Sequence, residues 1–372
     1  MKMTYTFDDI GLTQREKTTI ASRADVDLSV KINSTDYKVK TVLKVPIVSS
    51  PMDTVTGDKM ALAMNSIGGV GIIHRIQSIE SQVMQLKRCF QHTIGCQESQ
   101  VNNFGVAIGV NGDWKERLDS IFSLYKDYRP DIRHHTTLWI CFDTANGFTS
   151  MMEEALKYFH SKEYSNEMVL MTGNVLSAEG YEFLVKMKSD IVRIGVGGGS
   201  ACTTSVVTGV GVGTISILEE IQNGNVSEEH LMVDGGIRHS SDAVKAFAFG
   251  SRLVMLGRML SGFDESEGET ITDVNTGRKV KAYRGLSSKG VLNTINYVNG
   301  IEKTRTAEGI ETYVDYKGSV NDFLNEFVMG ISSAFTYFNS KNFEEFREYF
   351  EAYPDAITLL SGASQTERKP KF

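Results

Sequence analysis

The sequence is poor in several features that mark particular classes of protein. Its four cysteines match neither a zinc-binding pattern nor a disulfide framework, so we expect reduced thiols and a cytoplasmic protein. A formal charge of −7 leaves no basic excess to neutralise phosphates, so neither nucleic acid nor a membrane surface is an expected partner. No stretch approaches ~18 uninterrupted apolar residues, and Asp8 and Asp9 interrupt the first segment, so neither a membrane span nor a secretion signal is expected.

What remains is the composition of a globular chain, with 41% hydrophobic and 23% charged residues. Its 372 residues suit either two domains or one α/β barrel with insertions. Eight short apolar runs alternate with segments of helical spacing, as expected for strands that are buried on both faces. This alternation predicts a (β/α)8 TIM barrel, with an open doubly wound sheet as the competing architecture. The predicted strands are Pro46–Ser49, Gly69–His74, Phe104–Val110, Leu138–Asp143, Met168–Thr172, Ile191–Gly195, Leu231–Gly235 and Leu253–Gly257.

Polar and glycine-rich residues follow most of these strands, which favours the barrel because its active site collects at the carboxyl ends of all strands. From Asp264 to about Gly318 no barrel unit is present, and we expect a flap over the mouth, or else a solvated surface excursion. Val320–Tyr349 is predicted to supply the last barrel helix. We therefore expect one catalytic domain over residues 1–360 and a disordered tail over residues 361–372.

The loop from Gly195 to Thr204 carries the strongest chemical signal. Its glycines permit an amide nest that binds an anion with the help of Ser200, or carbonyls that surround a monovalent cation. Cys202 lies at the end of the loop, where amide dipoles would favour a thiolate nucleophile. The alternative is a small buried cysteine in a glycine turn.

Two further loops point to a nucleotide. Asp234-Gly-Gly and Gly257-Arg258 follow the seventh and eighth strands, where barrels often bind phosphate. Asp234 suits a ribose diol, because a carboxylate accepts hydrogen bonds from hydroxyl groups. These loops together predict a nucleoside monophosphate site. His74 ends a strand, and it is either an acid or base or a histidine hydrogen-bonded at the barrel rim.

At this point the motifs resemble those of the IMP dehydrogenase and GMP reductase family. The matching pieces run in one order along nearly the whole chain: Ser50-Pro-Met-Asp-Thr-Val, Gly71-Ile-Ile-His, the 195–204 loop, Val233-Asp-Gly-Gly-Ile-Arg, Val254-Met-Leu-Gly, Tyr283-Arg-Gly-Leu-Ser-Ser and Tyr316-Lys-Gly. The resemblance implies the barrel fold and a purine nucleotide, GMP or IMP, bound through a covalent cysteine adduct at C2.

The resemblance favours the reductase branch, which uses NADPH to convert GMP to IMP and ammonia. The Arg-Tyr pair that activates water in the dehydrogenase is absent between Ser288 and Glu308, and Thr304–Gly309 and Asp143–Gly147 resemble the reductase forms. Arg75, Gly198 and Ser205 depart from the reductase pattern. The alternatives are an IMP dehydrogenase without a regulatory domain pair, which would make XMP with NAD, and a non-catalytic nucleotide-binding barrel.

Carried over residue by residue, the resemblance implies a catalytic group, a nucleotide-binding group and a cofactor-binding group of residues. Cys202 would be the nucleophile, with Thr204 and Glu308 as the proton relay. The nucleotide would be held by Ser50, Met52, Ser200, Asp234, Gly235, Gly236, Gly257, Arg258, Tyr283, Gly285, Leu286, Ser287, Arg305 and Gly309. The cofactor would be held by Ser22, Arg23, Arg75, Asp143, Thr144, Ala145, Asn174, Gly195, Ser333 and Thr336.

The resemblance carries two further implications. Potassium would bind the carbonyls of Gly197, Gly199 and Cys202. Ser22 and Arg23 would reach the cofactor of a neighbouring subunit in a homotetramer.

Overall fold

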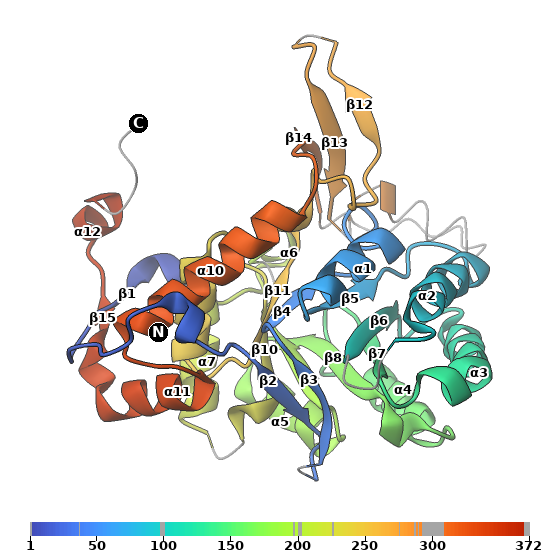
Figure 1. Ribbon diagram of the computed structural model, residues 1–372, viewed down its shortest axis with the longest axis horizontal. Helices are drawn as coiled ribbons and strands as arrows, with labels where there is room; N and C mark the ends of the chain where they lie inside the picture. The colour runs from blue at the N-terminus through green and yellow to red at the C-terminus, as the bar shows by residue number, and fades with distance from the viewer. Residues whose placement is uncertain are drawn as a thin grey trace.

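A closed barrel of eight parallel strands forms the centre of the molecule (Figure 1). The computed structural model describes residues 2–36, 38–96, 101–195, 198–199, 203–224, 227–274, 276–285, 288, 290–291 and 309–367. Each barrel strand pairs with the next one in sequence, and the last pairs with the first, which confirms the TIM barrel and excludes the open sheet. The strands are β4 (Ile47–Ser49), β5 (Val70–Ile73), β6 (Asn102–Ile108), β7 (Thr136–Asp143), β8 (Val169–Val175), β9 (Ile191–Ile194), β10 (Leu231–Asp234) and β11 (Leu253–Leu256).

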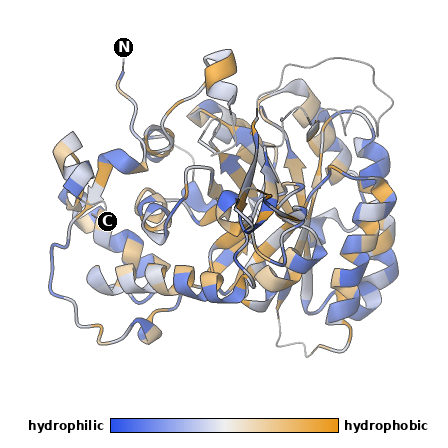
Figure 2. Ribbon diagram, turned by 90° about the horizontal axis from the view of Figure 1, so that it is seen from above, coloured by the Kyte–Doolittle hydropathy of each residue, from blue (hydrophilic) through white to orange (hydrophobic). Residues whose placement is uncertain are grey.

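One main helix follows each strand and covers the barrel from outside. Ser78, Thr149 and Ser177 cap three of these helices, since their side chains accept hydrogen bonds from main-chain amides of the first turn. In Figure 2 the helices carry hydrophilic and hydrophobic patches side by side, as expected when one face packs on the barrel. No helix within the described ranges is long and apolar enough to cross a bilayer. The covering helices are α1 (Asp58–Ser66), α2 (Ile79–Thr93), α3 (Trp114–Ile132), α4 (Ser150–His160), α5 (Ala178–Lys186), α7 (Thr214–Gln222), α8 (Ser240–Ala248) and α10 (Asn321–Tyr337).

A hairpin of β2 (Val30–Asn33) and β3 (Val39–Leu43) covers the amino ends of the barrel strands. Lys40 Nζ donates to Asp190 Oδ2 at 2.7 Å, immediately before β9. Thr41 Oγ1 donates to Asn103 Oδ1 at 3.0 Å, at the start of β6. The hairpin therefore closes one end of the barrel and leaves the carboxyl ends for ligands.

The expected excursion after the eighth strand contains a three-stranded antiparallel sheet that projects from the barrel (Figure 1). Its strands are β12 (Thr270–Thr272), β13 (Lys279–Arg284) and β14 (Glu311–Asp315). Lys281 Nζ anchors this sheet through the carbonyls of Phe263 and Ser266, at 2.8 and 2.6 Å. Closure of the flap over the mouth stays a prediction, because residues 292–308 lie outside the described ranges.

The last helical region differs from the prediction of one helix over Val320–Tyr349. It consists of α10 and a separate helix, α11 (Phe343–Ala352). Asn339 adopts a left-handed φ of 51°, which ends α10. Asn342 then caps α11 by accepting a hydrogen bond from the amide of Glu345 at 2.9 Å.

The tail also differs from the prediction of disorder from residue 361. Strand β15 (Ile357–Leu359) pairs with β1 (Ile10–Leu12), and a short helix, α12 (Gly362–Glu367), follows. Gln365 Nε2 donates to Asp9 Oδ1 at 3.1 Å, which ties this helix to the N-terminal segment. The predicted disorder is therefore wrong for residues 362–367, and residues 368–372 lie outside the described ranges. The remaining short helices are α6 (Thr204–Thr208), η1 (Phe7–Asp9), η2 (Arg23–Asp25), η3 (Ser165–Glu167), η4 (Glu228–His230), η5 (Arg258–Leu260) and η6 (Pro354–Ala356).

Candidate active site

The loops after β4 and β11 meet at the barrel mouth and bring three predicted nucleotide residues together. A Cβ atom placed on Gly257 would lie 3.2 Å from Met52 Sδ and 3.7 Å from Ser50 Cβ. The loop after β4 is held in turn, because Thr56 Oγ1 donates to the carbonyl of Ser50 at 2.7 Å. Glycine at position 257 thus permits a close approach that a larger side chain would obstruct.

The glycine loops after β9 and β10 lie against each other. A Cβ on Gly235, whose φ is +97°, would meet the amide nitrogen of Gly199 at 3.1 Å. A Cβ on Gly195 would lie only 2.5 Å from the carbonyl oxygen of Asp234. The structure therefore brings together the two loops that we predicted to surround a phosphate and ribose.

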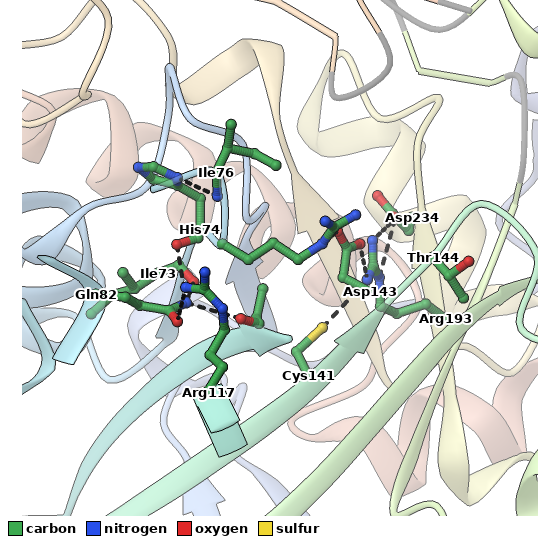
Figure 3. Close-up of polar contacts among 12 residues, drawn as sticks. Ile73, His74, Ile76, Gln82, Arg117, Cys141, Asp143, Thr144, Arg193 and Asp234 are labelled. Carbon is green, nitrogen blue, oxygen red and sulfur yellow. Dashed lines mark hydrogen bonds and ion pairs between the residues drawn. The ribbon is translucent and has the colours of Figure 1, made fainter. Parts of the chain in front are cut away.

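A buried arginine lies between the carboxylates of two predicted site residues (Figure 3). Arg193, in β9, is 3% exposed, and its Nη1 donates to Asp143 Oδ1 at 2.7 Å. Its Nη2 donates to Asp234 Oδ2 at 2.8 Å, and its Nε donates to the same oxygen at 3.2 Å. Asp143 and Asp234 end β7 and β10, so this one guanidinium fixes the strand ends of the predicted cofactor and nucleotide sides relative to each other.

Sequence reasoning did not single out Arg193, although it is a charged residue inside an otherwise apolar strand, Ile-Val-Arg-Ile. A charge in such a strand needs a buried partner, and two are present: Asp234 on the neighbouring strand β10, and Asp143 on β7, two places away. That signal was available in the sequence, but the partners depend on the barrel order of the strands.

Asn174, in β8, extends the same cluster. Its Nδ2 donates to Asp234 Oδ2 at 2.8 Å and to the carbonyl of Gly195 at 2.7 Å. Its Oδ1 is buried and has no hydrogen-bond partner in the described structure, so it can accept a hydrogen bond from a ligand. Among the described residues, every hydrogen bond donated to the Asp234 carboxylate ends on Oδ2. Oδ1 is therefore available to accept hydrogen bonds from the hydroxyl groups of a ligand.

Arg75 joins the cluster on the side predicted to bind the cofactor. Its Nε donates to Asp143 Oδ2 at 3.3 Å, so each oxygen of this carboxylate faces a different arginine. Burial alone would raise the pKa of Asp143, but Arg193 and Arg75 hold that pKa below its usual value. Asp143 is therefore ionised at neutral pH.

The loop that follows β7 is fastened to β8 through its main chain. The amide of Asn174 donates to the carbonyl of Thr144 at 2.7 Å, and the amide of Thr144 donates to the carbonyl of Gly173 at 3.1 Å. Ala145 is exposed beside them.

Two titratable side chains at the site are unsuited to proton transfer at neutral pH. Burial raises the pKa of the Cys141 thiol to about 12, and the described Cys89, Cys96 and Cys141 are all free thiols. His74 is 6% exposed, and its Nδ1 accepts a hydrogen bond from the amide of Ile76 at 3.1 Å. Burial, together with Arg117 and Arg284, lowers the pKa of His74 to about 3. The interpretation of His74 as a hydrogen-bonded rim histidine is thus supported over that of an acid or base.

The root of the flap supplies further predicted nucleotide residues. Tyr283 is buried at the end of β13, and the amide of Gly285 donates to the carbonyl of Ile310 at 3.0 Å. Gly309 forms a bridge with Ser288, so the segment after β13 and the segment before β14 lie side by side here.

Two cations from different segments lie near each other, because Arg258 follows β11 and Lys317 follows β14. Arg258, predicted for the phosphate, is exposed at the start of η5. Lys317, which we did not single out, donates through Nζ to the carbonyl of Ser261 at 3.0 Å. Burial and the neighbouring Arg258 lower the pKa of Lys317. Gly236, also predicted to contact the nucleotide, lies in the loop after β10 and has a φ of +81°.

Four predicted cofactor residues lie away from this cluster. Ser22 and Arg23 are exposed at η2, which packs on α10, the helix that carries Ser333 and Thr336. Helix α10 follows β11, and β11 stands four places around the barrel from β7, on the opposite side. Within one copy of the chain the structure therefore does not bring these residues to Asp143.

Among the remaining predicted residues, only Thr204 belongs to the part of the chain that the structure describes. Thr204 begins helix α6, on the loop that follows β9. The predictions for Gly197, Ser200, Cys202, Leu286, Ser287, Arg305 and Glu308 lie outside the described residues.

Comparison with known proteins identifies the family. Residues 4–371 match the IMP dehydrogenase / GMP reductase domain. The chain is similar to inosine-5'-monophosphate dehydrogenase of Borreliella burgdorferi, with 29% identity over 398 residues, covering 93% of this chain and 92% of that protein. It is also similar to GMP reductase of Caenorhabditis elegans, with 31% identity over 341 residues, covering 91% and 88%.

A solved structure agrees on the fold. It is a variant of GMP reductase from Trypanosoma brucei in complex with guanosine 5'-monophosphate, with a TM-score of 0.83 and 21% identity, covering 100% of this chain and 98% of that one. With a family domain that spans almost the whole chain and reductase relatives above 30% identity, this protein belongs to the IMP dehydrogenase / GMP reductase family of oxidoreductases.

Proposed function

We propose that the protein is an NADPH-dependent GMP reductase, which converts GMP to IMP and ammonia. The observation that carries the proposal is the Asp143–Arg193–Asp234 cluster, which joins the side predicted to bind the cofactor to the side predicted to bind the nucleotide. A site of this kind holds two ligands in a fixed mutual arrangement, as a hydride transfer requires. The similarity to the Caenorhabditis elegans reductase supports this branch of the family.

The proposed chemistry passes through a covalent bond at C2 of guanine. The Cys202 thiolate adds to C2, and the bond from C2 to the exocyclic nitrogen breaks. The nitrogen leaves as ammonia with a proton that Glu308 and Thr204 relay. Arg75, Asp143 and Asn174 would help to hold NADPH, which would supply the hydride for C2 and be oxidised to NADP⁺. As the hydride reaches C2, the carbon–sulfur bond breaks, which releases IMP and restores the thiolate.

Described residues are available for the ribose and the phosphate of the nucleotide and for one wall of its pocket. The available oxygen of Asp234 would accept hydrogen bonds from the ribose hydroxyls. The glycine loops meet at Gly199 and Gly235, and Arg258 and Lys317 supply positive charge after β11 and β14, which would suit a phosphate. Ser50, Met52 and Gly257 would form the wall of the same pocket.

The residues near β7 and β8 fit a nicotinamide cofactor. Asn174 Oδ1 is a buried acceptor without a partner among the described atoms, which suits the N–H of a carboxamide. Arg75 is 25% exposed while it holds Asp143, so part of its guanidinium can still meet an anion. Potassium at Gly197, Gly199 and Cys202 stays a prediction.

The position of η2 supports a site shared between subunits of a homotetramer. Ser22 and Arg23 lie on the barrel flank opposite Asp143, so they would reach a cofactor only in a neighbouring copy.

The alternative within the family is an IMP dehydrogenase, which the similarity to the Borreliella burgdorferi enzyme keeps in view. Product analysis decides between them. Incubation with GMP and NADPH should yield IMP and ammonia, while Cys202→Ser should bind GMP but form no product. XMP formed from IMP and NAD would establish the dehydrogenase instead. Nucleotide binding without product from either pair would establish a non-catalytic barrel.

A further inference from the structure

An ion pair with a buried carboxylate joins the root of the flap, at the end of β13, to the barrel. Asp53 lies in the loop between β4 and α1, and Arg284 is the last residue of β13. Arg284 Nε donates to Asp53 Oδ2 at 2.7 Å, and Nη2 donates to the same oxygen. The side chain of Asp53 is only 6% exposed. A carboxylate removed from water to this degree needs a positively charged partner.

Main-chain hydrogen bonds dock the same two segments. The amide of Arg284 donates to Thr54 Oγ1 at 3.3 Å, and the amide of Gly268 donates to the carbonyl of Thr54 at 3.3 Å. The β4 loop thus meets the flap at two places, just before β12 and at the end of β13. The side-chain pair adds a charged contact to this junction.

The two members of the pair stand between residues that we propose contact the nucleotide. Ser50 and Met52 precede Asp53 by three residues and one residue, and Tyr283 and Gly285 flank Arg284. A Cβ on Gly257 would lie 3.2 Å from Met52 Sδ, so the β4 loop forms one wall of the proposed pocket. The root of the flap forms another wall. The separation of these walls therefore depends on the junction between them.

We propose that Asp53 and Arg284 are a positioning pair for the nucleotide. They hold the β4 loop and the root of the flap at the spacing that fits a purine nucleoside monophosphate, without touching the reacting atoms. This inference rests on the proposed function, because it assumes that the pocket binds GMP or IMP.

The two residues should contribute unequally. Asp53 Oδ1 is buried and has no hydrogen-bond partner in the described structure, so Arg284 provides the compensation for this charge that the structure shows. Removal of Arg284 would leave a buried carboxylate uncompensated, which opens the junction. Asp53→Asn keeps an amide oxygen that can accept from Arg284, so its effect should be smaller.

Calorimetric titration with GMP and, separately, with NADPH tests the pair. Arg284→Met should weaken GMP binding by roughly tenfold or more, because one partner of a buried charge pair is lost. Arg284→Lys should restore part of the affinity, and the double variant Asp53→Asn, Arg284→Met should bind GMP better than Arg284→Met alone. The affinity for NADPH should stay within about twofold, because Asp143 and Asn174 belong to β7 and β8, three and four places from β4 around the barrel.

Arg129→Met is the matched control. Arg129 Nη2 pairs with Glu167 Oε1 at 2.6 Å, but this pair joins α3 to η3 away from the proposed nucleotide residues. The Arg129→Met variant should have a lower free energy of unfolding and an unchanged affinity for GMP. Equal weakening of GMP and NADPH binding by Arg284→Met, or no more weakening than in the control, would overturn the proposal.

Hydrogen exchange separates this inference from the proposed function. If the unmodified chain bound neither GMP nor IMP, the proposed function would fall. Faster amide exchange in residues 50–57 and 279–285 of Arg284→Met, but not of Arg129→Met, would still show that the pair orders these segments. Unchanged exchange there would remove the positioning role as well.

Discussion

The hydrogen bonds of Arg193 are the most informative about how this site is arranged. Three of its nitrogen atoms donate to two carboxylates that end different strands, at 2.7 to 3.2 Å. A lysine has one compact ammonium group and cannot reach both carboxylates with the same geometry. A buried cation with two anionic partners is also one that cannot be removed without leaving charge uncompensated.

We therefore predict that Arg193→Lys lowers kcat/KM for GMP roughly 30-fold or more, since a buried, charged hydrogen-bonded pair contributes about 2 kcal/mol or more. Steady-state kinetics with either substrate varied will measure this. Lys40→Met is the control, because Lys40 pairs with Asp190 at the closed end of the barrel. It should lower the unfolding free energy and leave kcat/KM unchanged. Equal kinetic losses in the two variants would remove the special role of Arg193.

From the environment of His74 we expect the free energy of unfolding to depend on pH. The unfolded chain binds a proton at this histidine near its usual pKa of 6.5, whereas in the folded protein the pKa is about 3. Between these values the unfolded state binds more protons, so stability falls as the pH falls, and the loss is complete below about pH 3.

Replacement His74→Gln should flatten this dependence. The unfolding free energy of the unmodified protein should fall about 1.4 kcal/mol per pH unit faster than that of the variant between pH 6 and 4.5. Urea titrations at several pH values will measure the two slopes. Parallel slopes would show that His74 is protonated in the folded protein.

The candidate site could be predicted from sequence at the level of loops, but not at the level of partners. Asp143, Asn174 and Asp234 follow or end apolar runs, so their place at the barrel mouth was readable. That Asp143 and Asp234 share Arg193 could not be predicted, because the contact depends on the order and register of β7 to β10. Lys317 was missed for a similar reason, since the chain returns to the mouth only after the flap.

At the scale of elements, apolar strands were predicted well because burial on both faces leaves little freedom in their composition. Breaks between helices were predicted less well. The separation of α10 from α11 depends on a left-handed Asn339 and on the cap at Asn342, which interrupt an otherwise continuous helical pattern. The helix α12 depends on a contact with Asp9, more than 350 residues earlier in the chain.

The cap of α11 provides a prediction at this scale. Asn342→Ala should lower the unfolding free energy by about 1 kcal/mol, because the amide of Glu345 loses its acceptor. Asn342→Asp keeps a side-chain acceptor and should retain most of the stability. Urea unfolding of the three proteins will test this. If Asn342→Asp lost as much unfolding free energy as Asn342→Ala, the lost cap would not be the cause of the destabilisation.

At the scale of the whole molecule, we propose that a second copy of the chain completes the cofactor site. Ser22, Arg23, Ser333 and Thr336 share a flank of the barrel that lies across from Asp143. Arg23→Ala should therefore weaken NADPH binding, and Cys202→Ser should abolish turnover, each in a pure oligomer.

Mixed oligomers of these two inactive variants should recover part of the activity. A subunit with Arg23→Ala keeps its own Cys202 and would receive Arg23 from a neighbour with Cys202→Ser. Activity after co-refolding or co-expression, with the mixed composition verified by mass spectrometry, measures this complementation. Mixed oligomers without activity would place Arg23 in its own subunit's site or outside the reaction.

The central claim is the direction of the hydride transfer, and absorbance at the reduced-nicotinamide band tests it most directly. The protein with GMP and NADPH should show a steady loss of this band, while IMP with NAD should produce no gain. An increase with IMP and NAD, and no loss with GMP and NADPH, would contradict the reductase assignment and establish the dehydrogenase.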